Sequence, residues 1–155
     1  MEAVKLPLDL GIPNDKPFYL FKASDAKWSK EMLSIGEKTY GQDIGGNVTD
    51  GPFLFKTQTG KLGMLWSSWG EKRYVLGVAY SKSGSIKGPW VQESEPLFKD
   101  NGGHGMLFHS FDGKLMLSLH WEDPADNHPF RKPIIIEVDD SGDKLYIKQG
   151  GTVIK

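Results

Sequence analysis

The chain has 155 residues, a formal charge of −1 from 19 Lys and Arg against 20 Asp and Glu, and no cysteine. This length suits a single domain, the balanced charge gives no attraction to nucleic acid or to an anionic membrane, and the lack of cysteine excludes disulfides and thiolate chemistry. Nineteen glycines, nine prolines and 12% aromatic residues favour an all-β fold with many tight turns.

The N-terminal third contains two short apolar segments and one helical pattern. Residues 3–6 and 17–22 are expected strands, separated by a loop rich in turn-forming residues. Ser24 or Asp25 can cap a turn or two of helix that would run through Met32. The N-terminus carries an acidic second residue and no long apolar run, so it does not resemble a signal peptide. No stretch approaches the roughly 20 apolar residues of a membrane helix.

From Asp50 onward a pattern of four short strands occurs twice. The first set is expected at residues 53–57, 62–68, 74–81 and 90–93, and the second at 106–110, 115–121, 133–139 and 144–148. Gly60-Lys61-Leu62 matches Gly113-Lys114-Leu115 at an offset of 53 residues. Units of this size with about four short strands are typical of β-propeller blades.

The repeat therefore predicts one partial β-propeller domain over residues 1–155, with about two and a half antiparallel four-stranded blades. We expect a half blade at 1–22, a connecting loop with a short helix at 23–49, and whole blades at 50–100 and 101–155. A propeller closes with four to eight blades, so an open arc of this size leaves blade faces and strand edges exposed. Either more chain or a second copy would cover them.

Asp50 and His104 stand at the heads of the first strands of the two blades. When the two repeats are aligned with a shift of one residue, Asp50 and His104 occupy matching positions. A propeller directs the starts of these strands toward one central cavity, so we expect the two side chains to meet. Asp50, followed by Gly51 and Pro52, can act as a general acid, hold a sugar hydroxyl or cap a turn. His104, between glycines, can contact substrate, orient a carboxylate, bind a metal or be purely structural.

Further candidates lie at strand ends near these two residues. Trp66 and Trp69 end a strand beside a loop, where flat indole faces can stack on sugar rings, although most tryptophans are core residues. His120 ends the next strand of its blade and points to the same end of the unit. Arg131 follows it and offers either a fixed fork for oxygen ligands or a solvated charge.

The motifs resemble those of a known family. The chain carries, in order, FKASDAKW, VTDGPFLF, LGMLWSSW, a Gly-Pro-Trp, GGHGMLF and LMLSLHW. This order resembles the C-terminal half of glycoside hydrolase family 43 and covers nearly the whole chain. The resemblance implies part of a five-bladed β-propeller that hydrolyses arabinose- or xylose-containing plant polysaccharides with inversion, as arabinofuranosidases and xylosidases of xylan degradation do.

The resemblance also implies roles for single residues. Asp50 takes the place of the catalytic acid, where most members have Glu, and His104 takes that of a histidine beneath the active site. That histidine often contacts a calcium ion through water, so calcium is the one expected ion, and no cofactor is required. Trp28 would lie on a loop near the pocket, and His120 and Arg131 in the substrate-facing region of the last blade.

No residue here corresponds to the family's catalytic base or to its third carboxylate, which come from the first two blades. We therefore expect no or very low glycosidase activity from this chain alone. The expected partner is an oligosaccharide or polysaccharide substrate. Two alternatives stay open. The chain could be an inactive carbohydrate-binding or self-associating half-propeller, hidden in a homodimer or against a missing N-terminal half, or it could be a protein-binding propeller. Family members are often secreted or periplasmic, but the sequence does not fix the compartment, the sugar or the linkage.

Overall fold

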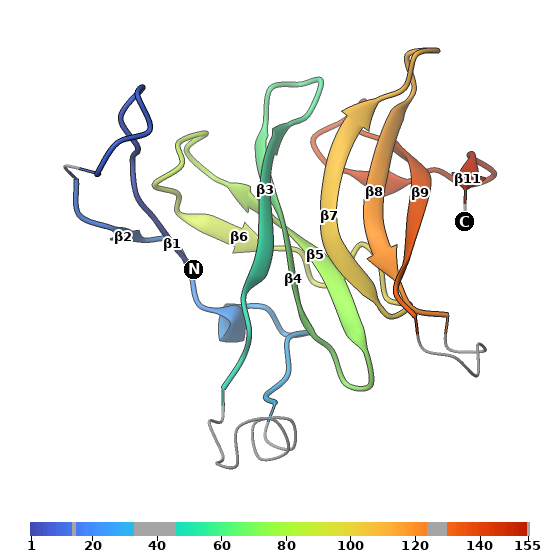
Figure 1. Ribbon diagram of the computed structural model, residues 1–155, viewed down its shortest axis with the longest axis horizontal. Helices are drawn as coiled ribbons and strands as arrows, with labels where there is room; N and C mark the ends of the chain where they lie inside the picture. The colour runs from blue at the N-terminus through green and yellow to red at the C-terminus, as the bar shows by residue number, and fades with distance from the viewer. Residues whose placement is uncertain (14, 33–45, 124–129, 155) are drawn as a thin grey trace.

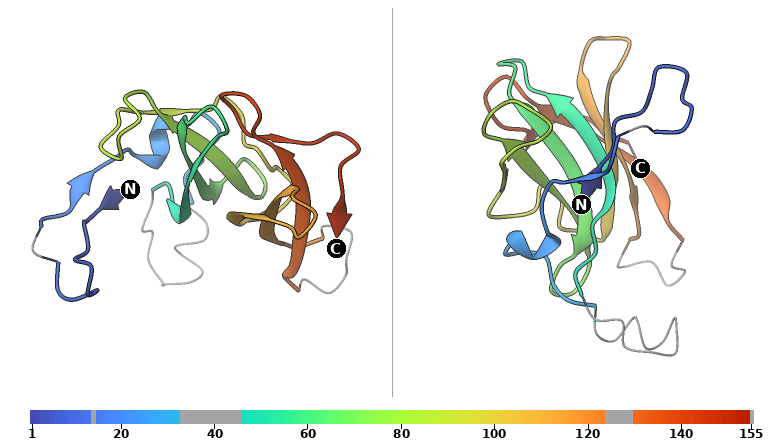
Figure 2. Two further views of the ribbon diagram at one scale, coloured as in Figure 1. Left: turned by 90° about the horizontal axis from the view of Figure 1, so that it is seen from above. Right: turned by 90° about the vertical axis from the view of Figure 1, so that its left-hand side faces the viewer.

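Three antiparallel β-sheets follow one another along an open arc in the computed structural model (Figures 1 and 2). The structure describes residues 1–13, 15–32, 46–123 and 130–154. No α-helix occurs in these ranges, and none of their segments forms a helix long and apolar enough to cross a membrane. The prediction of an all-β fold is confirmed.

The N-terminal segment forms the smallest sheet and one turn of helix. Strands β1 (Glu2–Ala3) and β2 (Phe18–Tyr19) pair antiparallel, and a 3₁₀ helix, η1, spans Ala23–Asp25. The expected helix through Met32 is wrong, because the chain leaves helical geometry at Ala26 and continues without regular structure to Met32. Residues 33–45 of the expected connecting loop lie outside the described part of the chain.

The second sheet has four strands in sequence order. They are β3 (Asp50–Lys56), β4 (Leu62–Trp69), β5 (Tyr74–Ser81) and β6 (Trp90–Gln92). Every residue of β5 is buried, which fits a strand covered on both faces. Gly60 forms the turn from β3 to β4 with a φ of +85° that favours glycine.

The third sheet repeats this plan and adds a strand. It contains β7 (Gly102–His109), β8 (Leu115–Trp121), β9 (Lys132–Asp139) and β10 (Tyr146–Ile147), in the spatial order β10-β9-β8-β7. The last strand, β11 (Val153–Ile154), also pairs with β9 and was not predicted from the sequence. The strand expected at 144–148 is shorter in the structure, where Tyr146 and Ile147 pair with Asp139 and Val138.

Two apolar cores hold the arc together. The larger lies between the second and third sheets, and its most buried members are Leu65, Leu76, Val78, Leu117, Leu119 and Ile134. The smaller lies on the other face of the second sheet, where Phe21, Ala26 and Trp28 of the N-terminal segment pack on Met64, Trp66 and Ala79. The second sheet is therefore covered on both faces, as an inner blade of a propeller must be.

The N-terminal segment and the third sheet form the two ends of the arc (Figure 2), and both ends carry exposed apolar side chains. Leu8, Leu10 and Ile12 are exposed in the loop between β1 and β2, and Met106, Phe108, Val153 and Ile154 are exposed on the last sheet. Leu107 packs into the larger core, so alternation along β7 directs Met106 and Phe108 to the opposite, open face. The chain thus forms a partial β-propeller whose terminal faces are uncovered among the described residues.

Candidate functional site

A bulge at the head of β3 presents the carboxylate of Asp50. Asp50 pairs with Ser67 and Phe53 with Leu65, so three residue steps in β3 span two in β4. The extra residue bends the strand and re-aims its side chains. Gly51 takes a φ of +52° in this bulge, a left-handed value that glycine adopts without strain.

The head of β7 contains the same bulge at an offset of 53 residues. Gly103 pairs with His120 and Met106 with Ser118, as Asp50 and Phe53 pair in β3. His104 has a φ of +52°, equal to that of Gly51. The repeat therefore runs through the strand heads without a slip, and the expected pairing of Asp50 with His104 as equivalent positions is wrong. His104 is the equivalent of Gly51.

Asp50 and His104 nevertheless meet in space. Nε2 of His104 lies 3.1 Å from Oδ1 of Asp50, and the two side chains are 48% and 42% exposed. The backbone N–H of His104 donates to Oγ of Ser67 at 3.0 Å, which ties the head of β7 to the strand that pairs with Asp50. The imidazole lies against Gly51, where a Cβ would come within 2.8 Å of its Cδ2 atom. Carboxylate and imidazole are thus held together and open to solvent.

Tyr74 joins this pair, and sequence reasoning missed it. Its hydroxyl donates to Oδ2 of Asp50 at 2.7 Å and lies 3.5 Å from Nδ1 of His104. One feature of the sequence could have indicated its position. Side chains alternate along a strand, so Tyr74 lies on the same face of β5 as Leu76 and Val78, which pack toward the third sheet. Burial first, and then hydrogen bonding to Asp50, raise the pKa of Tyr74 well above its ordinary value. The phenol therefore stays protonated and remains a donor.

His120 and Arg131 lie on the third-sheet side of this group. The His120 ring stacks on Tyr74 at a centroid distance of 5.5 Å and an interplanar angle of 17°, and it lies 5.5 Å from the ring of His104. Burial lowers the pKa of His120, and the charges of Arg131 and His104 lower it further. His120 is consequently neutral at pH 7, while Arg131 is exposed and adds positive potential.

The tryptophans divide into core and site. Trp66 is 0% exposed and its indole N–H donates to Gln92, while Trp28 is 8% exposed and packs on Trp66 with ring centroids 4.6 Å apart. Both indoles are buried in the smaller core, which corrects the expectation that Trp28 and Trp66 bind sugar. Trp69 is partly exposed and lies edge-on to Tyr74 at 5.6 Å, so it remains the one candidate of the three for stacking on a ligand.

The described residues do not form a metal site by themselves. No group of three or more His, Cys, Asp or Glu side chains among them could hold a metal ion. Both ring nitrogens of His104 face protein atoms, namely Oδ1 of Asp50 and the hydroxyl of Tyr74. The donor set therefore does not fit a directly bound ion, and calcium contacting His104 through water stays a prediction.

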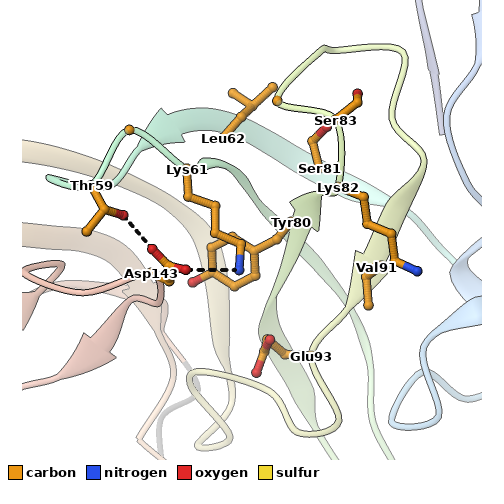
Figure 3. A pocket seen from close by; sticks show the side chains of 12 residues that line it. Thr59, Lys61, Leu62, Tyr80, Ser81, Lys82, Ser83, Val91, Glu93 and Asp143 are labelled. Atoms are coloured by element: carbon orange, nitrogen blue, oxygen red, sulfur yellow. Dashed lines mark hydrogen bonds and ion pairs between the residues drawn. The ribbon is translucent and has the colours of Figure 1, made fainter.

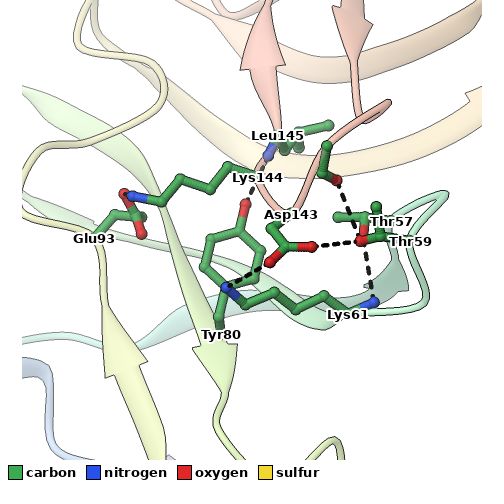
Figure 4. Close-up of polar contacts among 9 residues, drawn as sticks. Thr57, Thr59, Lys61, Tyr80, Glu93, Asp143, Lys144 and Leu145 are labelled. Atoms are coloured by element: carbon green, nitrogen blue, oxygen red, sulfur yellow. Dashed lines mark hydrogen bonds and ion pairs between the residues drawn. The ribbon is translucent and has the colours of Figure 1, made fainter.

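A groove of about 580 Å³ opens at the opposite end of the second sheet (Figure 3). It is lined by Thr59, Lys61, Tyr80, Ser81, Glu93 and Asp143, among others. Several of these side chains already have partners: Thr59 donates to Asp143 at 2.7 Å, and Glu93 accepts a hydrogen bond from Lys144 at 2.8 Å (Figure 4). Because Asp50 begins β3 whereas Lys61 precedes β4, this groove is separate from the site.

Comparison with known proteins identifies structures with a similar fold. Neither protein-family models nor curated sequences give a match, but several solved structures match the chain. An endo-arabinase from Bacteroides thetaiotaomicron VPI-5482 is 42% identical, with a TM-score of 0.73 over 86% of this chain and 44% of that protein. An endo-1,4-beta-xylanase from the same organism is 32% identical, with a TM-score of 0.57 over 71% of this chain and 40% of that protein.

A thermostable family-43 glycoside hydrolase shares the fold at 21% identity, with a TM-score of 0.70 over 95% of this chain and 46% of its own length. The chain thus spans less than half the length of each of these proteins. Its architecture is like that of a family-43 glycoside hydrolase, and the structures that resemble it are glycosidases.

Proposed function

We propose that this chain is the acid-bearing part of a family 43 type glycoside hydrolase that acts on arabinose- or xylose-containing plant polysaccharides. One observation carries the proposal. The fold is shared with an endo-arabinase at 42% identity. In this fold the solvent-accessible carboxylate of Asp50 lies at the start of an inner strand and contacts both His104 and Tyr74. An arrangement that fixes an accessible carboxylate in this way suits proton transfer to a leaving group.

Asp50 would act as the general acid. Inverting hydrolysis needs an acid that protonates the glycosidic oxygen and a base that activates water, about 6.5–9.5 Å apart. Asp50 would supply the proton while His104 orients its carboxyl group from the neighbouring blade. No residue of this chain is assigned to the base, so we expect the chain alone to show no or very low turnover.

Residues around Asp50 would contact the sugar. Trp69 offers a partly exposed indole beside Tyr74, and aromatic faces of this kind suit the apolar face of a sugar ring. His120 and Arg131 lie on the other side of the acid and offer polar groups for hydroxyl oxygens. The substrate would then lie across the heads of β3 and β7.

Two measurements test this function. Incubation with aryl arabinofuranosides and xylosides should give no turnover above background, whereas turnover that Asp50→Asn abolishes would show that the chain carries a complete catalytic site. Calorimetry with arabino- and xylo-oligosaccharides should detect binding that weakens about two- to tenfold when Trp69 is replaced by Ala, since stacking on one aromatic residue contributes about 0.5–1.5 kcal/mol. Absence of binding to both sugar series would refute the proposal.

A second candidate is an inactive carbohydrate-binding or self-associating half-propeller. The exposed apolar side chains at both ends of the arc favour it, for example Leu8, Ile12 and Met106, because exposed apolar surface of this kind commonly marks an interface. Light scattering distinguishes the assembly part of this hypothesis: a monomer at all concentrations would exclude self-association. Binding of sugar without turnover in a reconstituted full-length propeller would favour the binding module over the enzyme.

A further inference from the structure

The polar contacts of Asp50 are divided unequally between its two oxygens. Oδ1 receives the backbone N–H of Gly51 at 2.9 Å and lies 3.1 Å from Nε2 of His104 in an ion-pair contact, whereas Oδ2 receives the Tyr74 hydroxyl at 2.7 Å. A carboxylate offers about four acceptor sites, two on each oxygen. Among the described residues, Oδ1 therefore has two polar neighbours and Oδ2 has one, so Oδ2 keeps a site for another partner.

One donor in this group can be assigned from the same contacts. The single hydroxyl hydrogen of Tyr74 is directed at Oδ2, and its high pKa keeps that hydrogen in place across the working range of pH. This hydrogen cannot be shared with a substrate unless it leaves Asp50. Nε2 of His104 approaches Oδ1 as an ion-pair contact, and the tautomer of the ring sets its role toward the Tyr74 hydroxyl.

We propose that Oδ2 of Asp50 is the atom that passes the proton to the leaving group, and that Tyr74 is the positioning residue that aims it. The inference rests on the proposed role of Asp50 as the acid. In this step the O–H bond at Oδ2 breaks and a new O–H bond forms on the glycosidic oxygen, which takes the electron pair of the broken bond to the sugar carbon. Oδ2 is left with negative charge, and the Tyr74 hydroxyl already points at it.

This arrangement favours proton transfer for an electrostatic reason. A hydrogen bond to a charged acceptor is about twice as strong as one to a neutral acceptor, so the Tyr74 contact strengthens as Oδ2 loses its proton. Stabilisation that grows along the reaction lowers the barrier, whereas equal stabilisation before and after would not. Among the described residues, the other titratable groups near the carboxylate are His104 from β7 and His120 from β8, and the charges of Arg131 and Glu122 at the ends of the β8–β9 connection act on His120.

Carbon-detected NMR of the Asp50 carboxyl group at a fixed pH of 7 tests the contact without any sugar. Tyr74→Phe keeps the ring that stacks on His120 and removes only the hydroxyl. Because this removal takes the hydrogen-bond donor away from Oδ2, it should shift the resonance of the Asp50 carboxyl carbon. Tyr19→Phe is the matched control, because Tyr19 is exposed on β2 and should leave that resonance unchanged.

An unchanged carboxyl resonance in Tyr74→Phe, with the fold intact, would overturn the inference. If this variant does not fold, the wild-type protein provides the test: a slowly exchanging Tyr74 hydroxyl proton with a cross-peak to the His104 ring supports the contact, and rapid exchange with solvent overturns it. The result is separable from the proposed function. A chain that binds no sugar but shows the shifted carboxyl resonance in Tyr74→Phe would refute only the hydrolase, and a sugar-binding chain with an unchanged resonance would refute only the role of Tyr74.

Discussion

Gly51 and His104 occupy equivalent positions in two neighbouring sheets, share a φ of +52°, and lie in contact with each other. At Gly51 the left-handed backbone and the lack of a side chain both matter, because a Cβ there would press on the imidazole and on the backbone of His104. His104 accepts the same backbone conformation with a side chain, which places its ring over the neighbouring strand head.

Substitution of Gly51 by Ala should therefore separate the two strand heads. We expect the free energy of unfolding to fall by about 2–4 kcal/mol, which combines left-handed strain with the steric clash. Gly60→Ala is the matched control, since Gly60 has a φ of +85° and no atom within 4 Å of a built Cβ, and it should cost about 1–2 kcal/mol. Urea denaturation measures both values, and equal losses would show that the His104 contact contributes nothing.

The sequence predicted the meeting of Asp50 and His104 because a repeat transfers geometry from one blade to the next. It misplaced their register by one residue, since a bulge adds a residue to a strand without leaving a distinct pattern of side chains. Tyr74 was missed for a related reason. Periodicity assigns its ring to a face of β5, but it does not reveal that the hydroxyl reaches an acid on β3.

Burial explains the errors with tryptophan. Trp66 ends an apolar strand beside a loop, which is equally compatible with a core position and a binding surface. Trp66 is buried by the N-terminal segment, since Phe21 and Trp28 of that segment pack against its ring. That long-range contact depends on how residues 1–32 fold back over the sheet, and strand patterns within a blade carry no information on it.

Tyr80 links the second sheet to the third, and its hydroxyl should contribute measurably to stability. The hydroxyl accepts the backbone N–H of Leu145 at 2.7 Å in a buried contact (Figure 4), and burial raises the pKa of Tyr80 to about 12. Tyr80→Phe leaves a buried N–H without its acceptor, so we expect unfolding to become easier by about 1–3 kcal/mol. Tyr146→Phe, on an exposed side chain, should change the denaturant midpoint negligibly. A loss of similar size in both variants would contradict the assigned contact.

Glu137 should make the stability of the last sheet depend on acid pH. Hydrogen bonds from Lys148 and from the backbone of Thr152 lower the pKa of Glu137 from 4.5 to about 2. Because the folded state holds the carboxylate ionised more firmly than the unfolded state, this stabilisation is complete above about pH 4.5 and is lost as the pH falls toward 2. Thermal unfolding of the wild type between pH 6 and pH 2 should show this decline. Glu137→Gln should be less stable at pH 6 and should flatten the curve, whereas a curve parallel to that of the wild type would exclude Glu137 as its source.

His120 should produce a second pH dependence closer to neutrality. Burial and the nearby positive charge of Arg131 lower the pKa of His120 below its ordinary value of 6.5, so the unfolded chain binds a proton more readily than the folded chain. Stability attributable to this residue is therefore intact above pH 6.5 and decreases as the pH falls below that value.

His120→Gln should be less stable than the wild type at every pH, because it removes the ring stacked on Tyr74. Its stability should nevertheless fall less than that of the wild type when the pH is lowered from 7.5 to 5.5. Urea midpoints at these two pH values measure the difference, with His109→Gln as the control at an exposed position on β7. If the change between pH 7.5 and 5.5 is the same in His120→Gln and in the wild type, the neutral imidazole assigned to the site is incorrect.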